Sequence, residues 1–163
     1  MDNIKLYNVD PNYINYLSSY APHMFLNKQR GQQNERKYIG IVLSINGFDY
    51  FAPFSSYKEK HRFMKDSIDF IKIKHYAVVN LNNMFPIPEG TYEYVDIAKE
   101  RNPKYRDLLR AEYRYIKSVQ EKIRKNAANL YHHKTVNGNA TALAKRCNDF
   151  LSLEKACRQH PKK

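Results

Sequence analysis

Residues 37–53 carry a hairpin pattern that constrains the fold more than any other part of the sequence. The apolar run Lys37–Ile45 is followed by Asn46-Gly47 and by a second run, Phe48–Pro53. Asn-Gly favours the two-residue turn of a β-hairpin, because both residues tolerate a positive φ. The pattern therefore predicts two antiparallel strands. Since alternate side chains of a strand point to the same side, one face is predicted to hold Ile39, Ile41, Leu43 and Ile45.

Shorter patterns predict the elements around this hairpin. Asp10 and Pro11 form a helix start, with a cap and a proline at the first helical position, and the helix is predicted over Pro11–Tyr20. Residues 21–36 have no clear period and are predicted to form a long loop, which in a compact domain is often functional. Extended segments are predicted at Ile4–Asn8, Ser67–Ile73, Tyr76–Leu81 and Phe85–Pro88.

The second half of the chain has a helical pattern. Asn102-Pro103 forms another helix start, and apolar residues then recur every seven positions at Leu109, Ile116, Ile123 and Leu130. This spacing predicts one amphipathic helix of about seven turns that ends at Asn137-Gly138. Asn139 is predicted to cap a last helix whose buried face holds Ala140, Leu143, Ala144, Cys147, Phe150 and Leu151. The predicted fold class is α+β, with a small antiparallel sheet and flanking helices in one domain over residues 1–163.

Positive charge is concentrated in this helical part. The formal net charge is +12, and residues 99–134 supply +7 of it, from 11 lysines and arginines against 4 acidic residues. Clustered cations attract polyanions and release their counterions on binding, so nucleic acid is a candidate partner. A solvated helix face is the alternative. The candidate RNA-binding cations of the helix are Arg106, Arg110, Arg114, Lys117 and Arg124.

Several classes of protein are excluded. No segment has the apolar length of a membrane span, and the N-terminus lacks the apolar run of a signal peptide, so a cytoplasmic location is expected. The two cysteines, Cys147 and Cys157, are expected to be reduced, because ten residues of helix would keep them apart. No phosphate loop, metal-ligand spacing or carboxylate cluster is present, so no metal or other cofactor is expected.

Residues 53–63 supply the candidate catalytic groups. Two hydroxyls, several cations and a histidine follow directly on a strand end: Ser55, Ser56, Lys58, Lys60, His61 and Arg62. RNA cleavage by its own 2′-hydroxyl needs a base, an acid and cations near the phosphorane. The alternative is structural, with Ser56 and Glu59 forming a capping box at the start of a helix. Both readings can hold together, because a helix N-terminus also binds phosphate.

These segments resemble the ToxN/AbiQ family, including its CptN-like members. The resemblance is carried by Lys37–Leu43, by the Asn-Gly hairpin, and by the run Tyr50–His61, which is similar to the family's (L/F)APL(T/S)SPKxKH. It continues in Val79-Asn80-Leu81 before Met84–Ile87, and in Tyr105–Leu109 before Tyr113 and Ile116. Tyr57 departs from the pattern, which usually has proline there.

The resemblance implies a toxin endoribonuclease of a type III toxin–antitoxin system. It implies a highly twisted antiparallel sheet with flanking helices, similar to the MazF/Kid toxins. It also implies metal-independent cleavage to 2′,3′-cyclic phosphate and 5′-hydroxyl ends, and inhibition by pseudoknots of a repetitive antitoxin RNA in closed ring assemblies. The implied catalytic residues are Lys37, Ser55, Ser56 and Lys58, with His61 nearby. Arg36, Lys60 and Arg62 are further candidate RNA contacts beside them.

Two other functions fit the charge. A non-catalytic RNA- or DNA-binding protein would use the same basic helix, and an adaptor could bind acidic proteins. Neither needs the cluster of Ser55, Ser56, Lys58 and His61, which is therefore the feature that separates an enzyme from a binder.

Overall fold

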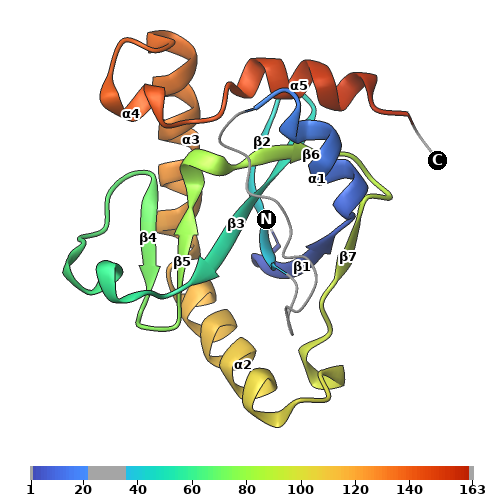
Figure 1. Ribbon diagram of the computed structural model, residues 1–163, viewed down its shortest axis with the longest axis vertical. Coiled ribbons are helices and arrows are strands. Elements are labelled where there is room, and N and C mark those ends of the chain that lie inside the picture. The colour runs from blue at the N-terminus through green and yellow to red at the C-terminus, as the bar shows by residue number, and fades with distance from the viewer. Residues whose placement is uncertain (1, 22–35, 162–163) are drawn as a thin grey trace.

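The protein is described by a computed structural model for residues 2–21 and 36–161 (Figure 1). The described strands form one antiparallel sheet of seven strands in the order β4-β5-β3-β2-β1-β7, with β6 paired to β3. The strands are β1 (Lys5–Val9), β2 (Tyr38–Ile45), β3 (Phe48–Ser56), β4 (Phe70–Ile73), β5 (Ala77–Asn80), β6 (Phe85–Ile87) and β7 (Tyr92–Tyr94). The predicted α+β class with an antiparallel sheet is confirmed.

The predicted hairpin forms β2 and β3. Asn46 and Gly47 both have positive φ, 54° and 80°, as the tight hairpin turn requires. The predicted alternation is wrong in the middle of β2, because the register with β3 shifts between Gly40 and Leu43. Ile39 and Leu43 belong to one core cluster as predicted, but Val42 joins them and Ile41 packs against the other cluster. A shift of one residue moves the following side chains to the opposite face.

Two hydrophobic clusters cover the two faces of the sheet. Along β3, Tyr50, Ala52 and Phe54 pack in one cluster with the buried residues of α2 (Pro103–Ser118) and α3 (Gln120–Asn137). Phe51 packs in the other cluster with α1 (Pro11–Ser18) and with Leu153 of α5 (Phe150–Gln159). Figure 1 shows α2 and α3 following one another along one side of the sheet, while α5 lies across the end of the molecule opposite to α2. This central position of β3 fixes the orientation of its last residues.

Gly40 is required by the packing of β2 on β3. A Cβ atom at this position would lie 2.2 Å from ring carbons of Phe51, which is itself buried. Only glycine lets the two strands approach this closely, so the residue is fixed by the tertiary contact.

The long helix predicted over residues 103–137 is two helices. Asn102 caps α2 as predicted, accepting a hydrogen bond from the amide of Tyr105, but the chain turns at Val119, where φ is −114° and ψ is 14°. The hydroxyl of Ser118 donates to the carbonyl of Tyr115 at 2.6 Å, a local bond that competes with the helical ladder. The side-chain oxygen Oε1 of the next helical residue, Gln120, accepts a hydrogen bond from the backbone amide of Ile4 at 2.9 Å. These contacts hold the break in place.

The last predicted helix is also divided. Thr141 rather than Asn139 caps the short helix α4 (Ala142–Lys145), and Asp149 caps α5. Asn139 instead accepts a hydrogen bond from Lys134. Leu151, predicted to be buried, is 54% exposed because the break turns it outward. Cys147 and Cys157 are both free, as predicted, although they do not share one helix, and both are buried.

Strand limits differ elsewhere by a few residues. The strand predicted over Ser67–Ile73 begins at Phe70, because Ser67 makes only an isolated bridge to Phe70.

The predicted loop over residues 21–36 lies, for residues 22–35, outside the described part of the chain. No helix of the described residues is long and apolar enough to cross a membrane.

Candidate active site

The end of β3 positions the two candidate serines. Ser55 and Ser56 pair with Val78 and Ala77 of β5, so they continue the strand. The predicted capping box of Ser56 and Glu59 is therefore wrong, since β3 runs through Ser56 and the next helical turn, η1 (Glu59–Phe63), begins after Lys58. Ser55 is half-buried and accepts a weak hydrogen bond from Asn80 at 3.4 Å, whereas Ser56 is exposed. Both hydroxyls are thus held on a rigid element.

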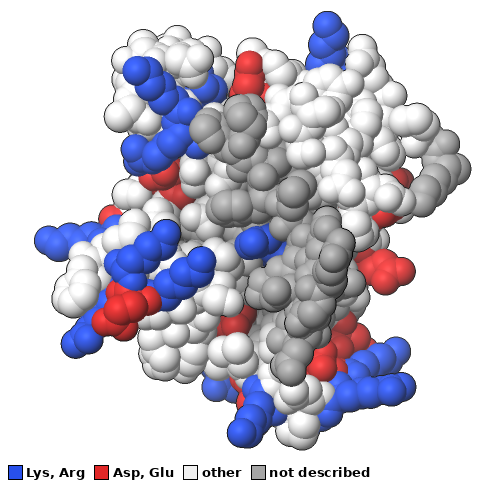
Figure 2. Space-filling view, in the orientation of Figure 1, with Lys and Arg blue, Asp and Glu red and all other residues white. Residues whose placement is uncertain are grey.

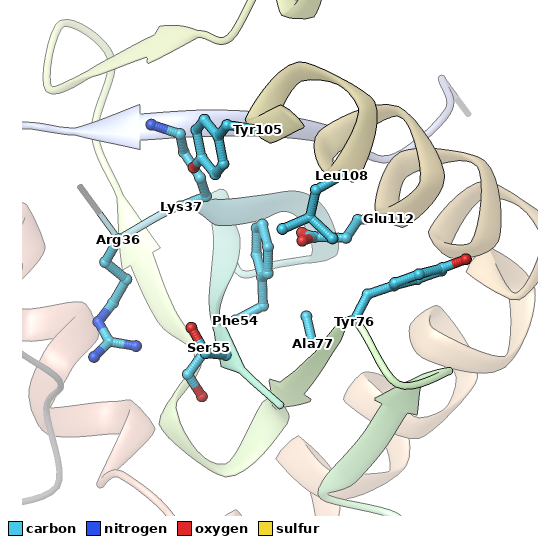
Figure 3. Close-up of a pocket in the computed structure, with 10 residues that line it drawn as sticks. Arg36, Lys37, Phe54, Ser55, Tyr76, Ala77, Tyr105, Leu108 and Glu112 are labelled. Carbon is cyan, nitrogen blue, oxygen red and sulfur yellow. The ribbon is translucent and has the colours of Figure 1, made fainter. Parts of the chain in front are cut away.

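A pocket of about 130 Å³ lies at this strand end. It brings together four of the sequence-predicted residues: Ser55 and Ser56 at the end of β3, and Arg36 and Lys37 just before β2. Its other lining residues are Phe54, Tyr76, Ala77, Tyr105, Leu108 and Glu112 (Figure 3). Hydroxyls and cations meeting beside aromatic walls suit a nucleotide and its phosphate.

Lys37 is the cation that immediately precedes β2. Its ammonium donates to Asn8 of β1 at 2.8 Å and lies 5.9 Å from the centre of the Tyr105 ring. In Figure 3 this ammonium points away from Ser55, toward β1, while Arg36 lies below it on the same side. Burial lowers the pKa of Arg36, an effect that nearby Tyr38 opposes. The two cations thus border the pocket on one side.

Lys58 and His61 lie beyond the pocket lining. The backbone amide of Lys58 donates to Nδ1 of His61 at 2.7 Å, while the Lys58 side chain is exposed. His61 is buried and contacts the rings of Tyr57 and Phe70, whose centroids lie 5.7 and 5.6 Å from its own. Burial, followed by Lys60, Lys58 and Lys72, lowers the pKa of His61 below its ordinary value. The observed contact of His61 is with the loop that carries Lys58, and its catalytic role stays a prediction.

The candidate RNA-binding cations do not form one surface. Lys60 and Arg62 are exposed on η1, and Arg62 pairs with Glu59 at 3.4 Å. Arg110, Arg114 and Lys117 are exposed on α2, where their spacing places them on one face. Figure 2 shows lysines and arginines gathered over the η1–β4 region, over α4 and near the start of α2.

Several cations of the C-terminal part make contacts within the fold. Arg106 donates to the carbonyl of Glu100 at 3.2 Å, and half-buried Arg124 donates to the carbonyl of Asp2. Lys134 is buried and donates to the carbonyl of Ala144 at 2.8 Å. Arg146 bonds the buried Asp69 at 2.6 and 2.9 Å. The exposure and contacts of each cation, rather than the net charge of the sequence, therefore indicate where a polyanion can bind.

Two features of the site were missed in the sequence. Glu112 is buried on α2 with Leu109 and Ile116. The signal that could have revealed it is its spacing, three residues after Leu109 and four before Ile116, which places a polar residue on the apolar face. The second feature is an open groove of about 640 Å³ lined by Tyr57, Lys65, Asp66, Lys72, Lys74, His75 and Tyr115.

The groove adjoins the pocket. Ser56 and Tyr76 line the pocket, and the residues next to them in the chain, Tyr57 and His75, line the groove. The Lys74 ammonium lies 5.7 Å from the centre of the Tyr115 ring. Cations and tyrosines in one groove favour single-stranded nucleic acid. Only the packing of β4 and of the turn after it against α2 brings these residues together.

Comparison with known proteins gives one consistent result. A family model described as Toxin ToxN, type III toxin–antitoxin system, matches residues 5–158. The chain is 30% identical to endoribonuclease ToxN of Bacillus thuringiensis subsp. kurstaki, over 98% of this chain and 85% of that protein. It is 27% identical to endoribonuclease AbiQ of Lactococcus lactis subsp. lactis, over 98% of this chain and 91% of that protein.

A solved structure agrees with these relatives. It comes from work on selective toxin inhibition by a non-coding RNA pseudoknot in bacterial type III toxin–antitoxin systems. The TM-score is 0.86 at 28% identity, with 99% of this chain and 100% of that chain covered.

Proposed function

Because the chain belongs to the ToxN family of type III toxin–antitoxin toxins, we propose that the pocket at the end of β3 is where this endoribonuclease cleaves RNA. The observation that carries the proposal is the meeting of Ser55, Ser56, Lys37 and Arg36 in one pocket. The exposed Lys58 follows two residues after Ser56, within reach of a phosphate held at the strand end.

The chemistry that these residues support is transesterification by the RNA. The 2′-oxygen forms a bond to the adjacent phosphorus, and the bond from phosphorus to the 5′-oxygen breaks. A base takes the 2′-hydroxyl proton and an acid protonates the departing 5′-oxygen, which leaves a 2′,3′-cyclic phosphate and a 5′-hydroxyl. We propose that Ser56 orients the 2′-hydroxyl or relays its proton and that Lys58 stabilises the charge on the phosphorane. The same role for Lys37 requires its ammonium to turn from Asn8 toward the bound phosphate. His61 positions the Lys58 loop.

Cleavage in the presence of a chelator tests this proposal. We expect purified protein to cut single-stranded RNA at an unchanged rate in EDTA, because the proposed chemistry uses hydroxyl and ammonium groups. End analysis should find 5′-hydroxyl and 2′,3′-cyclic phosphate termini. Activity that EDTA abolishes, or 3′-hydroxyl products, would contradict the mechanism. Tight binding without any cleavage would instead support the non-catalytic alternative.

The partner that we propose is an antitoxin RNA. The related system studied with a non-coding RNA pseudoknot shows selective toxin inhibition. We propose the same kind of inhibitor here, processed by the toxin from a repetitive transcript and held in a closed toxin–RNA assembly. Cellular mRNA is the other substrate, which places the protein in the cytoplasm.

Charge reversal in two sets of cations tests whether the inhibitor RNA and the substrate RNA contact different surfaces. Reversing the charge of Arg110, Arg114 and Lys117 on α2 should weaken inhibition by the RNA more than it weakens cleavage of a short substrate. The log–log slope of binding against salt should shrink by about 2, because each single-strand phosphate contact contributes about 0.7. Reversing the charge of Lys72 and Lys74 should weaken inhibition by the RNA and cleavage of the short substrate alike, because the groove that they line adjoins the pocket.

Filter binding over a salt series, beside cleavage of a short RNA, measures both effects. The α2 helix should still fold in the triple variant, because the buried Leu109 and Ile116 are untouched. If wild type and the triple variant share the same slope and the same inhibition, this face of α2 is only solvated.

A further inference from the structure

Glu112 is a buried acidic residue in the wall of the RNA-cleaving pocket. It lies on the inner face of α2 with Leu109 and Ile116, and only 4% of its surface is exposed. In Figure 3 its carboxyl group points from α2 toward the ring of Phe54, into the space that the lining residues enclose. An acidic group inside a site for a polyanion needs an explanation.

The carboxyl group has unused hydrogen-bonding capacity. Its Oε2 atom is buried and has no hydrogen-bond partner among the described residues. Burial raises the pKa of Glu112 to about 8. An ionised carboxylate without a partner is costly in an apolar site, so the group is a neutral acid at pH 7 and carries an O–H donor.

The charged groups nearby do not neutralise it. Arg36, Lys37, Tyr76 and Tyr105 share the pocket, and no ion pair or hydrogen bond joins any of them to Oε2 of Glu112 in the described structure. Burial is the cause of its raised pKa.

The elements packed against α2 carry other ionisable residues, which are engaged elsewhere. Lys5 of β1 lies over the ring of Tyr94, and Lys72 of β4 lines the groove. Lys99 of η3 (Ile97–Lys99) pairs with Asp96, and Lys122 of α3 pairs with Asp66.

We infer that Glu112 is a substrate-binding residue that acts as a neutral carboxylic acid, donating a hydrogen bond to an acceptor of the nucleotide that occupies the pocket. This inference rests on the proposed function of the pocket. The neutral form presents a donor to the RNA, whereas the ionised form presents only acceptors and a negative charge next to phosphate. RNA binding in the pocket should therefore weaken as Glu112 loses its proton.

Binding of a non-cleavable RNA tests the inference at several pH values. The probe is a short RNA with a 2′-deoxy nucleotide at the cleavage site, measured between pH 6 and pH 9. For wild type we expect the Kd to rise about tenfold from pH 7 to pH 9, because the protonated fraction of a group with a pKa near 8 falls from roughly 0.9 to roughly 0.1. Glu112→Gln keeps a donor but cannot ionise, so its Kd should lack this pH dependence. Glu112→Leu should bind about tenfold more weakly than wild type at pH 7.

A matched control and a second measurement complete the test. Glu121→Gln alters an exposed glutamate at the start of α3 and should keep the wild-type pH profile. A Glu112→Gln protein with the wild-type profile, or a Glu112→Leu protein with wild-type affinity at pH 7, would overturn the inference. Cleavage by wild type is assayed separately, so a protein that binds RNA in this pH-dependent way but never cuts it would contradict the proposed reaction and leave the role of Glu112 supported.

Discussion

Alanine at Ser56 or at Lys58 is expected to lower the rate of RNA cleavage about 10²- to 10³-fold and to abolish growth arrest. Removing one preorganised group that stabilises a transition state has a typical cost of this size. Ser56 ends β3 at the pocket, and Lys58 presents its ammonium from the next exposed loop. Neither side chain belongs to the core, so the fold should be unchanged.

Single-turnover cleavage and growth after induction at equal expression measure this effect. Ser152→Ala and Lys155→Ala are matched controls, because both residues are exposed on α5. Circular dichroism and the melting temperature of each variant should match wild type. A Ser56→Ala protein that still arrests growth would remove Ser56 from the mechanism, and a Lys58→Ala protein with normal rate would remove Lys58.

Loss of the Glu154 carboxylate is expected to destabilise the fold by roughly 3–5 kcal/mol, as removal of one partner of a buried polar network does. Glu154 of α5 is 5% exposed and accepts hydrogen bonds from the hydroxyls of Tyr50 at 2.7 Å and Tyr131 at 2.6 Å. These residues come from β3 and α3, so the carboxylate joins the sheet to two helices. In Glu154→Ala both buried hydroxyls lose this acceptor, and Tyr50 keeps only a long bond of 3.5 Å to the carbonyl of Phe150.

Urea unfolding of matched variants tests the network. The triple variant Glu154→Leu, Tyr50→Phe, Tyr131→Phe removes the carboxylate and both tyrosine hydroxyls at once. It should recover a large part of the stability lost in Glu154→Ala, because no buried donor is left unpaired. Asn46, which also donates to Tyr131 and Glu154, is exposed and can bond water instead. Lys155→Ala, one residue away but exposed, is the control. A Glu154→Ala protein as stable as this control would show that the network contributes little.

The sequence predicted best where the signal is local. The turn at Asn46-Gly47 and the helix starts at Asp10-Pro11 and Asn102-Pro103 depend on the backbone preferences of two or three residues, and all three are confirmed. The predicted helix limits were wrong where tertiary contacts determine where a helix ends. The break at Val119 is held by contacts of Gln120 with the N-terminal segment, more than a hundred residues away.

In the candidate site, too, the sequence predicted residues that are near in the chain, and the tertiary structure determined which of them share a pocket. The resemblance to the toxin family pointed to the serines, and the structure places Ser55 and Ser56 with Lys37 and Arg36 in one pocket. Lys58 and His61 follow nearby in the chain but lie outside the pocket lining, because η1 begins directly after Lys58. Their catalytic roles stay predictions.

By itself the sequence determined the antiparallel hairpin, the fold class and the family, because turn chemistry, alternation of apolar residues and ordered motifs are properties of neighbouring residues. Only the tertiary structure decided which charges are available to RNA and which are used by the fold. It also placed Glu112 inside the pocket and Glu154 between three elements. The physical reason is that burial and pairing of a charged group depend on residues distant in the chain, whose approach no local pattern encodes.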